Sequence, residues 1–241
     1  ASKRFSRSAV PTSKGDEPMT TAAPLHTVTR GDGPPAVFVH GLDDDARLWE
    51  PVVDLLDGDF RCVSVDLPGH GGSPTPTDPA AYEREAVLAS LDLVLADLDG
   101  PSVLIGHSLG GYLGLAHAIT RPGVLGGLVL VATGPGFRDP EAREKWNGRV
   151  AANTPDYGIT ETAARIAFHV DSLVIDRITE VQVPTALIVG SRDKGFLGAN
   201  DYLERKLPHA ARTTVDGGGH KVMRSHPAVV ADAVRSVATP R

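Results

Sequence analysis

Residues 102–111 read SVLIGHSLGG, an apolar run that leads into a Gly-x-Ser-x-Gly motif centred on Ser108. The run is typical of a buried strand, and Leu109–Thr120 behind the motif follow the pattern of a helix. A direct passage from strand to helix needs a very tight turn, and Gly106 and Gly110 remove side chains where the two elements crowd each other. The stretch therefore predicts a strained Ser108 that presents its hydroxyl at the edge of a sheet.

On both sides of this stretch, short apolar runs alternate with longer amphipathic ones. The predicted strands are Leu25–Thr29, Ala36–His40, Arg61–Asp66, Ser102–Gly106, Gly127–Ala132, Thr185–Gly190 and Arg212–Val215. The predicted helices between them are Ala46–Leu56, Tyr82–Leu98, Leu109–Thr120, Asn200–Lys206 and Ala228–Val237. This alternation predicts an α/β fold, with a mostly parallel sheet that carries helices on both faces.

One region interrupts the alternation, because about fifty residues separate Ala132 from Thr185. They are predicted to form three helices, over Asp139–Ala152, Ile159–Val170 and Leu173–Thr179. A plain crossover rarely needs three helices, so we expect residues 134–183 to form a short helical lid over the strands' carboxyl ends. The core then comprises residues 25–133 and 184–241. Residues 1–24 lack periodicity and are expected to be a disordered tail or sequence added for expression.

Composition narrows the class of protein. The chain has 241 residues, 41% of them hydrophobic and 22% charged, with a net charge of −6. It lacks the basic surplus of proteins that bind nucleic acid or anionic lipid. The single cysteine, Cys62, excludes an intramolecular disulfide, and no apolar run reaches the roughly 18 residues of a membrane span. We expect a cytoplasmic monomer or homodimer.

A serine hydroxyl is a weak nucleophile and needs a base, which in this architecture follows an acid later in the chain. His220 ends a glycine-rich loop after the last predicted strand, and this loop can return the imidazole to the sheet edge. The competing histidines are less well placed. His209 lies in a turn, His226 precedes a proline, and His169 belongs to the predicted lid.

The acid that orients the imidazole is expected at Asp193, which follows the strand Thr185–Gly190. Asp216 lies too close to His220 in sequence, and two other candidates, Asp171 and Asp176, fall in the predicted lid. The predicted catalytic residues are therefore Ser108, Asp193 and His220.

Two backbone N–H groups are expected to stabilise the negative charge of an intermediate. One belongs to Leu109, directly after Ser108, and the other to Leu42 in the loop after the strand Ala36–His40. His40 is interpreted as a residue that shapes this loop. Contacts to a small-molecule substrate are predicted for four residues, although the two aromatic ones could equally pack the lid onto the core: His40, Gly41, Phe137 and Trp146. The reaction needs no metal and no organic cofactor.

Several motifs together resemble the α/β-hydrolase superfamily from about Leu25 to the C-terminus. They are His40-Gly41, DLPGHGGS at 66–73, GHSLGG at 106–111, GSRD at 190–193 and Gly219-His220. The resemblance implies an α/β-hydrolase fold with a sheet of seven or eight strands. The sequence departs from the family in that the usual N-terminal pair of strands is reduced to Leu25–Thr29, which favours seven. The resemblance also implies hydrolysis of a carboxylic ester through an acyl-enzyme, with a structural role for the loop 66–73.

The resemblance leaves other reactions open. The same residues could hydrolyse a carbon–carbon bond of a diketone, open a lactone, hydrolyse a thioester or perform a cofactor-free lyase reaction. A serine at position 108 argues against the dehalogenase and epoxide-hydrolase branches, which resemblance says use aspartate. A different class is a receptor that binds a small molecule under the lid without converting it.

Overall fold

The computed structural model of the protein describes residues 22–238, so the predicted tail 1–24 falls largely outside the described residues. Within the described part, seven strands form one sheet in the order β1-β3-β2-β4-β5-β6-β7. Their bounds are β1 (Thr27–Arg30), β2 (Pro35–Val39), β3 (Arg61–Val65), β4 (Ser102–His107), β5 (Leu125–Val131), β6 (Thr185–Gly190) and β7 (Ala210–Val215). β1 is antiparallel to β3, and the other neighbouring pairs are parallel. The predicted fold is confirmed, with seven strands.

The central strands are apolar along their whole length because both faces of the sheet are covered. Every residue of β2, β4 and β6 is buried. Successive side chains of a strand point to opposite faces, so Val37 and Val39 join the core on one face, while Ala36 and Phe38 join the core on the other.

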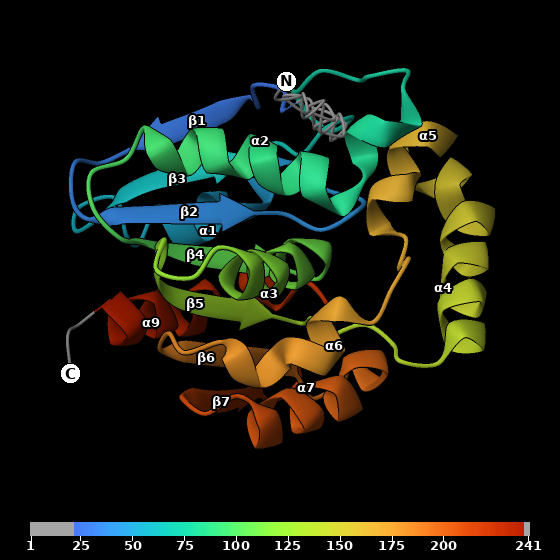
Figure 1. Ribbon diagram of the computed structural model, residues 1–241. Helices are drawn as coiled ribbons and strands as arrows, with labels where there is room; N and C mark the ends of the chain where they lie inside the picture. Colours follow the sequence, from blue (N-terminus) through green and yellow to red (C-terminus); the bar gives the residue numbers. More distant parts are fainter. Residues whose placement is uncertain (1–21, 239–241) are drawn as a thin grey trace, which may run out of the picture.

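Helices form a layer on each face (Figure 1). One layer contains α2 (Arg84–Ala96), α3 (Leu109–Thr120) and α7 (Lys194–Lys206), and the other contains α1 (Glu50–Val53) and α9 (Pro227–Ala238). The shorter elements of the core are the 3-10 turns η1 (Ala46–Trp49) and η2 (Pro79–Tyr82) and the helix α8 (Val222–Ser225).

Two predicted helices differ from the observed ones. The helix expected over Ala46–Leu56 is divided into η1 and α1, because Pro51 has no N–H to donate to an earlier carbonyl. The helix expected over Asn200–Lys206 begins six residues earlier, at Lys194. Gly195 and Gly198 are poor helix formers, so the sequence pattern did not indicate the first turns of this helix.

Residues between β5 and β6 form α4 (Pro140–Asn153), η3 (Thr154–Tyr157), α5 (Glu161–Ala164), η4 (Arg165–Ala167), α6 (Leu173–Arg177) and η5 (Ile178–Glu180). The single helix predicted over Ile159–Val170 is wrong, because this stretch contains only α5 and η4 before the chain extends. The N–H of His169 donates to the side chain of Asn147 at 2.8 Å instead of to a helical carbonyl. Figure 1 shows α4 set apart from the sheet at one end of the molecule.

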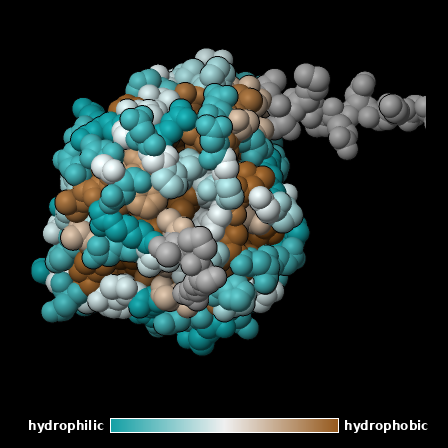
Figure 2. Space-filling view, turned by 90° about the vertical axis from the view of Figure 1, so that its left-hand side faces the viewer, coloured by the Kyte–Doolittle hydropathy of each residue, from teal (hydrophilic) through white to brown (hydrophobic). Residues whose placement is uncertain are grey.

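Within residues 22–238, the opposite end of the molecule carries no such extension. Figure 2 shows this end, where apolar residues form separate patches among polar ones. Exposed apolar side chains in the described part include Val28, Leu93 and Val124. No helix among residues 22–238 is long and apolar enough to cross a membrane.

Candidate active site

The turn between β4 and α3 holds Ser108 in an unfavourable backbone conformation, with φ 48° and ψ −109°. Such a residue costs about 1–3 kcal/mol and persists only where its surroundings hold it in place. A Cβ on Gly106 would lie 2.4 Å from the carbonyl carbon of Gly110, so the turn has no room for a side chain at Gly106. Ser108 is half-buried and precedes the N-terminus of α3, whose dipole favours negative charge.

His220 and Asp193 lie in the loops that follow β7 and β6, and a hydrogen bond joins their side chains. His220 Nδ1 lies 2.8 Å from Asp193 Oδ2. Because an ionised carboxylate can only accept, Nδ1 carries the proton and Nε2 keeps its lone pair. The Asp193 side chain is 9% exposed and that of His220 is 36% exposed. The acid is therefore shielded from water, while the imidazole remains accessible.

Two rings contact the His220 imidazole. Phe196 stacks on it with 4.7 Å between ring centroids, and the His107 ring lies at the same centroid distance in a tilted arrangement. His107 also donates from Nε2 to the His220 carbonyl at 3.1 Å. Burial first, and then the neighbouring His220, lowers the pKa of His107 well below its usual value. A neutral His107 thus links His220 to the residue directly before Ser108.

The loops of Asp193 and His220 pack backbone against backbone. A Cβ on Gly190 would lie 2.2 Å from the carbonyl oxygen of Gly218. The Arg192 N–H donates to the same oxygen at 2.9 Å. This close approach explains why glycine stands at 190, the last residue of β6, and at 218, in the loop after β7.

The loop after β2 lies beside the turn at Ser108, since a Cβ on Gly41 would stand 3.4 Å from Ser108 Cβ. Within residues 22–238, the N–H of Leu42 donates to no protein acceptor. The N–H of Leu109 is the first of α3 and has no acceptor within its helix. Both donors predicted for an oxyanion are therefore available to a bound group.

His40 orients the peptide group that contains the Leu42 N–H. Its Nε2 accepts from the Leu67 N–H at 3.0 Å, so Nδ1 carries the proton and donates to the Gly41 carbonyl at 2.6 Å. Burial, with a smaller effect of the nearby His70, lowers the pKa of His40 to about 4. Both nitrogens are engaged inside the protein, which agrees with a loop-shaping role. A direct contact of His40 with substrate stays a prediction.

The loop 66–73 contacts the loop that carries Leu42. The two ring nitrogens of His70 lie 2.9 Å from the Pro68 carbonyl and 2.7 Å from the Leu42 carbonyl. Asp66 accepts from the backbone N–H groups of Ala46 and Gly72. These contacts connect the loop after β3 to the loop that carries Leu42.

The other aspartates considered as the partner of His220 have different hydrogen-bond partners. Asp171 forms a pair of hydrogen bonds with Arg84, and Asp176 accepts from Arg138. Asp216 accepts from Ser191 at 3.3 Å. Among the carboxylates considered from the sequence, Asp193 is the one bonded to His220.

Phe137 and Trp146 belong to an aromatic cluster between α4 and α3. His169 is its centre, with ring centroids 5.3 Å from Phe137, 5.7 Å from Trp146 and 4.6 Å from Tyr112. Tyr112 lies one helical turn after Ser108, which places the cluster next to the candidate site. His169 is buried, its Nδ1 has no hydrogen-bond partner, and burial lowers its pKa to about 4. Contacts of Phe137, Trp146 and Gly41 with substrate stay predictions.

Sequence reasoning missed residues that support the candidate site. Thr133 donates its hydroxyl to the Ser108 carbonyl at 2.6 Å, and Asn200 donates to the Thr133 carbonyl at 3.0 Å. Phe196 could have been suspected, because it follows Asp193 by about one helical turn. No feature of the sequence indicated the role of His107, since the Gly-x-Ser-x-Gly motif allows any residue at that position.

Comparisons with known proteins point to one family and one fold. A family profile described as "alpha/beta hydrolase fold" matches residues 34–174. A pimeloyl-[acyl-carrier protein] methyl ester esterase of Chromobacterium violaceum is 28% identical, over 84% of this chain and 93% of that protein. A protein with the same name from Nitrosomonas europaea is 40% identical, over 48% of this chain and 43% of that protein.

In several other curated relatives, the match with this chain covers less than half of the relative's length. Among solved structures, a putative non-heme bromoperoxidase, BpoC from Mycobacterium tuberculosis H37Rv, has a TM-score of 0.77 at 17% identity. That match covers 90% of this chain and 96% of the other. At such low identity the similarity shows the shared fold.

Proposed function

Because the chain belongs to the alpha/beta hydrolase fold family, we propose that it is a serine hydrolase that cleaves carboxylic esters of small molecules. The observation that carries the proposal is the hydrogen bond between His220 and Asp193 beside a strained Ser108. The methyl ester esterases among its relatives agree with this reaction class. The catalytic residues are Ser108, His220 and Asp193, and no metal or organic cofactor takes part.

The first half of the reaction forms an acyl-enzyme. His220 Nε2 takes the hydroxyl proton of Ser108 as Oγ attacks the ester carbonyl carbon. The carbonyl oxygen becomes negative and accepts hydrogen bonds from the N–H groups of Leu42 and Leu109. When the carbonyl re-forms, the bond to the alcohol breaks, and the alcohol leaves with the proton from His220.

The second half repeats these steps with water. His220 takes a proton from water, whose oxygen attacks the acyl carbon, and the bond to Ser108 Oγ then breaks. Ser108 recovers its proton from His220, and the carboxylic acid is released. Asp193 stays ionised throughout and stabilises the transiently charged imidazole.

Residues 134–183 act as the lid in this proposal. The aromatic cluster around His169 adjoins Tyr112, one turn from Ser108. In this proposal Phe137 and Trp146 contact the acyl group. Apolar and aromatic walls of this kind suit a small acyl chain. The protein acts on a free small molecule in the cytoplasm, as a monomer or homodimer.

The test uses the Ser108→Ala variant with a short-chain nitrophenyl ester and a fluorophosphonate probe. The proposal expects a loss of kcat of about 10⁴-fold or more and no labelling of the variant. Arg30→Met, which removes the ion pairs of Arg30 with Asp54 and Asp57, is the control and keeps normal activity. An esterase activity that survives in Ser108→Ala would exclude the mechanism.

The same assay panel separates the rival functions. Lactones, thioesters and a diketone are offered beside the nitrophenyl ester at equal concentration. A higher kcat/KM for one of them would replace the ester as the substrate class but keep Ser108 as the nucleophile. Tight binding of these compounds without turnover or labelling would support a receptor instead.

A further inference from the structure

Charged residues directly follow two of the candidate catalytic groups. Lys221 comes after His220, and Asp43 and Asp44 come after Leu42. Lys221 Nζ lies 2.9 Å from Asp43 Oδ2 and 2.8 Å from Asp44 Oδ2. These two ion pairs join loops that are 178 residues apart in the sequence.

A further ion pair connects these residues to α8. The side chain of Asp44 is 4% exposed and also pairs with Arg224 of α8, at 3.1 Å. Burial alone would lower the pKa of Lys221, but the contacts to Asp44 and Asp43 outweigh it, and its pKa is raised. We call Asp43, Asp44, Lys221 and Arg224 the ionic strap.

The two loops joined by the ionic strap carry groups that must act on one substrate carbonyl. The loop of His220 contains three consecutive glycines, 217–219, and glycine is the residue with the widest backbone freedom. The loop of Leu42 bears the predicted oxyanion donor. A shift of about 1 Å in such groups can lower a rate about 100-fold.

We propose that the ionic strap positions the general base His220 relative to the oxyanion donor Leu42 N–H. The inference rests on the proposed function, because it assigns the strap to that same reaction. Lys221, Asp43 and Asp44 are positioning residues, since they act through their neighbours in the chain. His107 also holds the His220 backbone, because it donates to the His220 carbonyl, so the strap and His107 together limit the movement of His220.

The experiment measures kcat and KM for the nitrophenyl ester in Lys221→Met, Asp44→Asn and the double variant. Each single substitution is expected to lower kcat roughly tenfold with KM changed less than twofold, because substrate binding does not depend on the strap. The double variant should lose the same roughly tenfold rather than 100-fold, since the first substitution already breaks the contact. Lys221→Arg should restore most of kcat.

Arg30→Met is the matched control, because Arg30 also bridges two aspartates, Asp54 and Asp57. In the sheet, Arg30 of β1 lies opposite Cys62, near the start of β3. Ser108 follows the carboxyl end of β4, so Arg30 lies at the other end of the strands. Thermal unfolding of each variant shows whether it folds, and Asp43→Asn replaces any variant that does not. The strap proposal expects kcat to fall in the strap variants while Arg30→Met stays at the wild-type value.

Three outcomes would overturn the strap proposal: a kcat of Lys221→Met within twofold of Arg30→Met, multiplicative losses in the double variant, or no recovery in Lys221→Arg. If Ser108→Ala is inactive and Lys221→Met is normal, the proposed function stands and only the strap proposal fails. If Ser108→Ala stays active, the proposed function fails, and the strap proposal fails with it.

Discussion

At the residue scale, the strained backbone of Ser108 is held by contacts from three directions. Its N–H donates to the Val131 carbonyl at 2.9 Å, and its carbonyl accepts both from Tyr112 N–H and from the Thr133 hydroxyl. Thr133 in turn follows Ala132, whose φ of 50° is the other positive value found on a non-glycine residue of the described part. The residues at the end of β5 thus hold the backbone of Ser108 directly after β4.

Substitution of Thr133 tests whether its hydroxyl helps to hold the Ser108 backbone. Thr133→Val keeps the shape but removes the donor to the Ser108 carbonyl, so we expect kcat to fall roughly tenfold with KM unchanged. Thr133→Ser keeps the donor and should remain near the wild-type kcat. Steady-state kinetics and the rate of fluorophosphonate labelling measure both effects. Equal kcat values in the two variants would show that the hydroxyl does not position Ser108.

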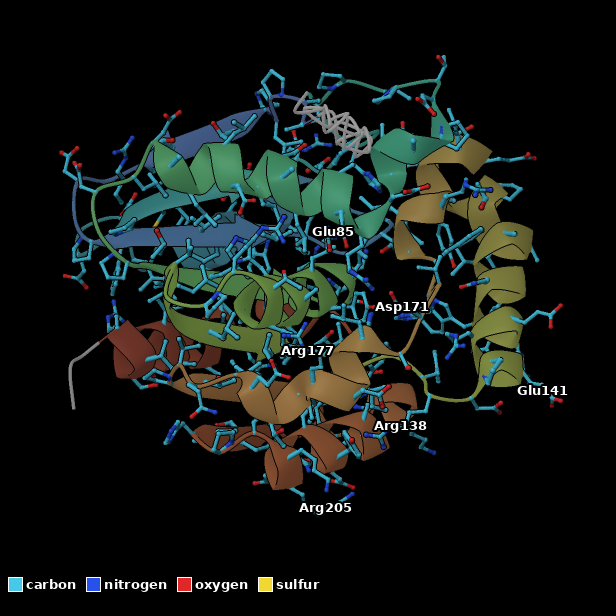
Figure 3. The ribbon with its side chains drawn as sticks, in the orientation of Figure 1. Glu85, Arg138, Glu141, Asp171, Arg177 and Arg205 are labelled. Carbon is cyan, nitrogen blue, oxygen red and sulfur yellow. The ribbon has the colours of Figure 1, made fainter. Side chains whose placement is uncertain are left out.

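At the element scale, residues 134–183, the proposed lid, are tied to α2 by the segment that leads into α6. Arg84 is the first residue of α2, and its guanidinium makes two hydrogen bonds to Asp171, of 2.8 and 2.7 Å. Figure 3 shows Asp171 between α4 and the sheet, on the chain segment that leads into α6. The Arg84 side chain is 13% exposed and that of Asp171 is 42% exposed, so water competes for this pair mainly at the aspartate.

We expect Arg84→Met to loosen the insertion without unfolding the core. Loss of about 1.4 kcal/mol of local stability raises the open population tenfold, so thermolysin should cut residues 134–183 roughly tenfold faster. Arg177→Met is the control, since Arg177 of α6, labelled in Figure 3, forms an exposed pair with Glu180. Mass spectrometry of the fragments locates the cuts. Cleavage of Arg84→Met at the wild-type rate would contradict this anchoring role.

At the scale of the whole molecule, buried neutral histidines couple stability to pH. Burial is the main cause that lowers the pKa of both His40 and His169 to about 4, against about 6.5 in an unfolded chain. Between these values the unfolded chain binds more protons, so the free energy of unfolding decreases as the pH falls from 6.5 to 4. Each residue contributes a loss of about 3 kcal/mol at the acid end.

Urea unfolding at pH 7 and pH 4.5 measures this loss. The wild-type midpoint should fall markedly at the lower pH. His169→Phe fits the aromatic cluster and cannot be protonated, so its midpoint should fall less. A midpoint that is unchanged between the two pH values, or an equal decrease in both proteins, would contradict the assignment of neutral buried histidines.

Much of the fold and of the candidate site could be predicted from local patterns. Short apolar or β-rich runs located all seven strands, and Ser108, Asp193 and His220 each follow one of these strands in the sequence. Since parallel strands end at a common edge, these positions predicted that the three residues lie near one another. The hydrogen bond between Asp193 and His220 agrees with that prediction.

The sequence by itself therefore determined the sheet, the glycines of the turn at Ser108 and the residues offered for catalysis, because these depend on neighbours a few positions apart. Only the tertiary structure decided the extended chain at His169, the anchor at His107 and the ion pairs of Lys221. Each depends on a side chain that meets a partner more than twenty residues away. Folding brings such partners together, and no local periodicity records them.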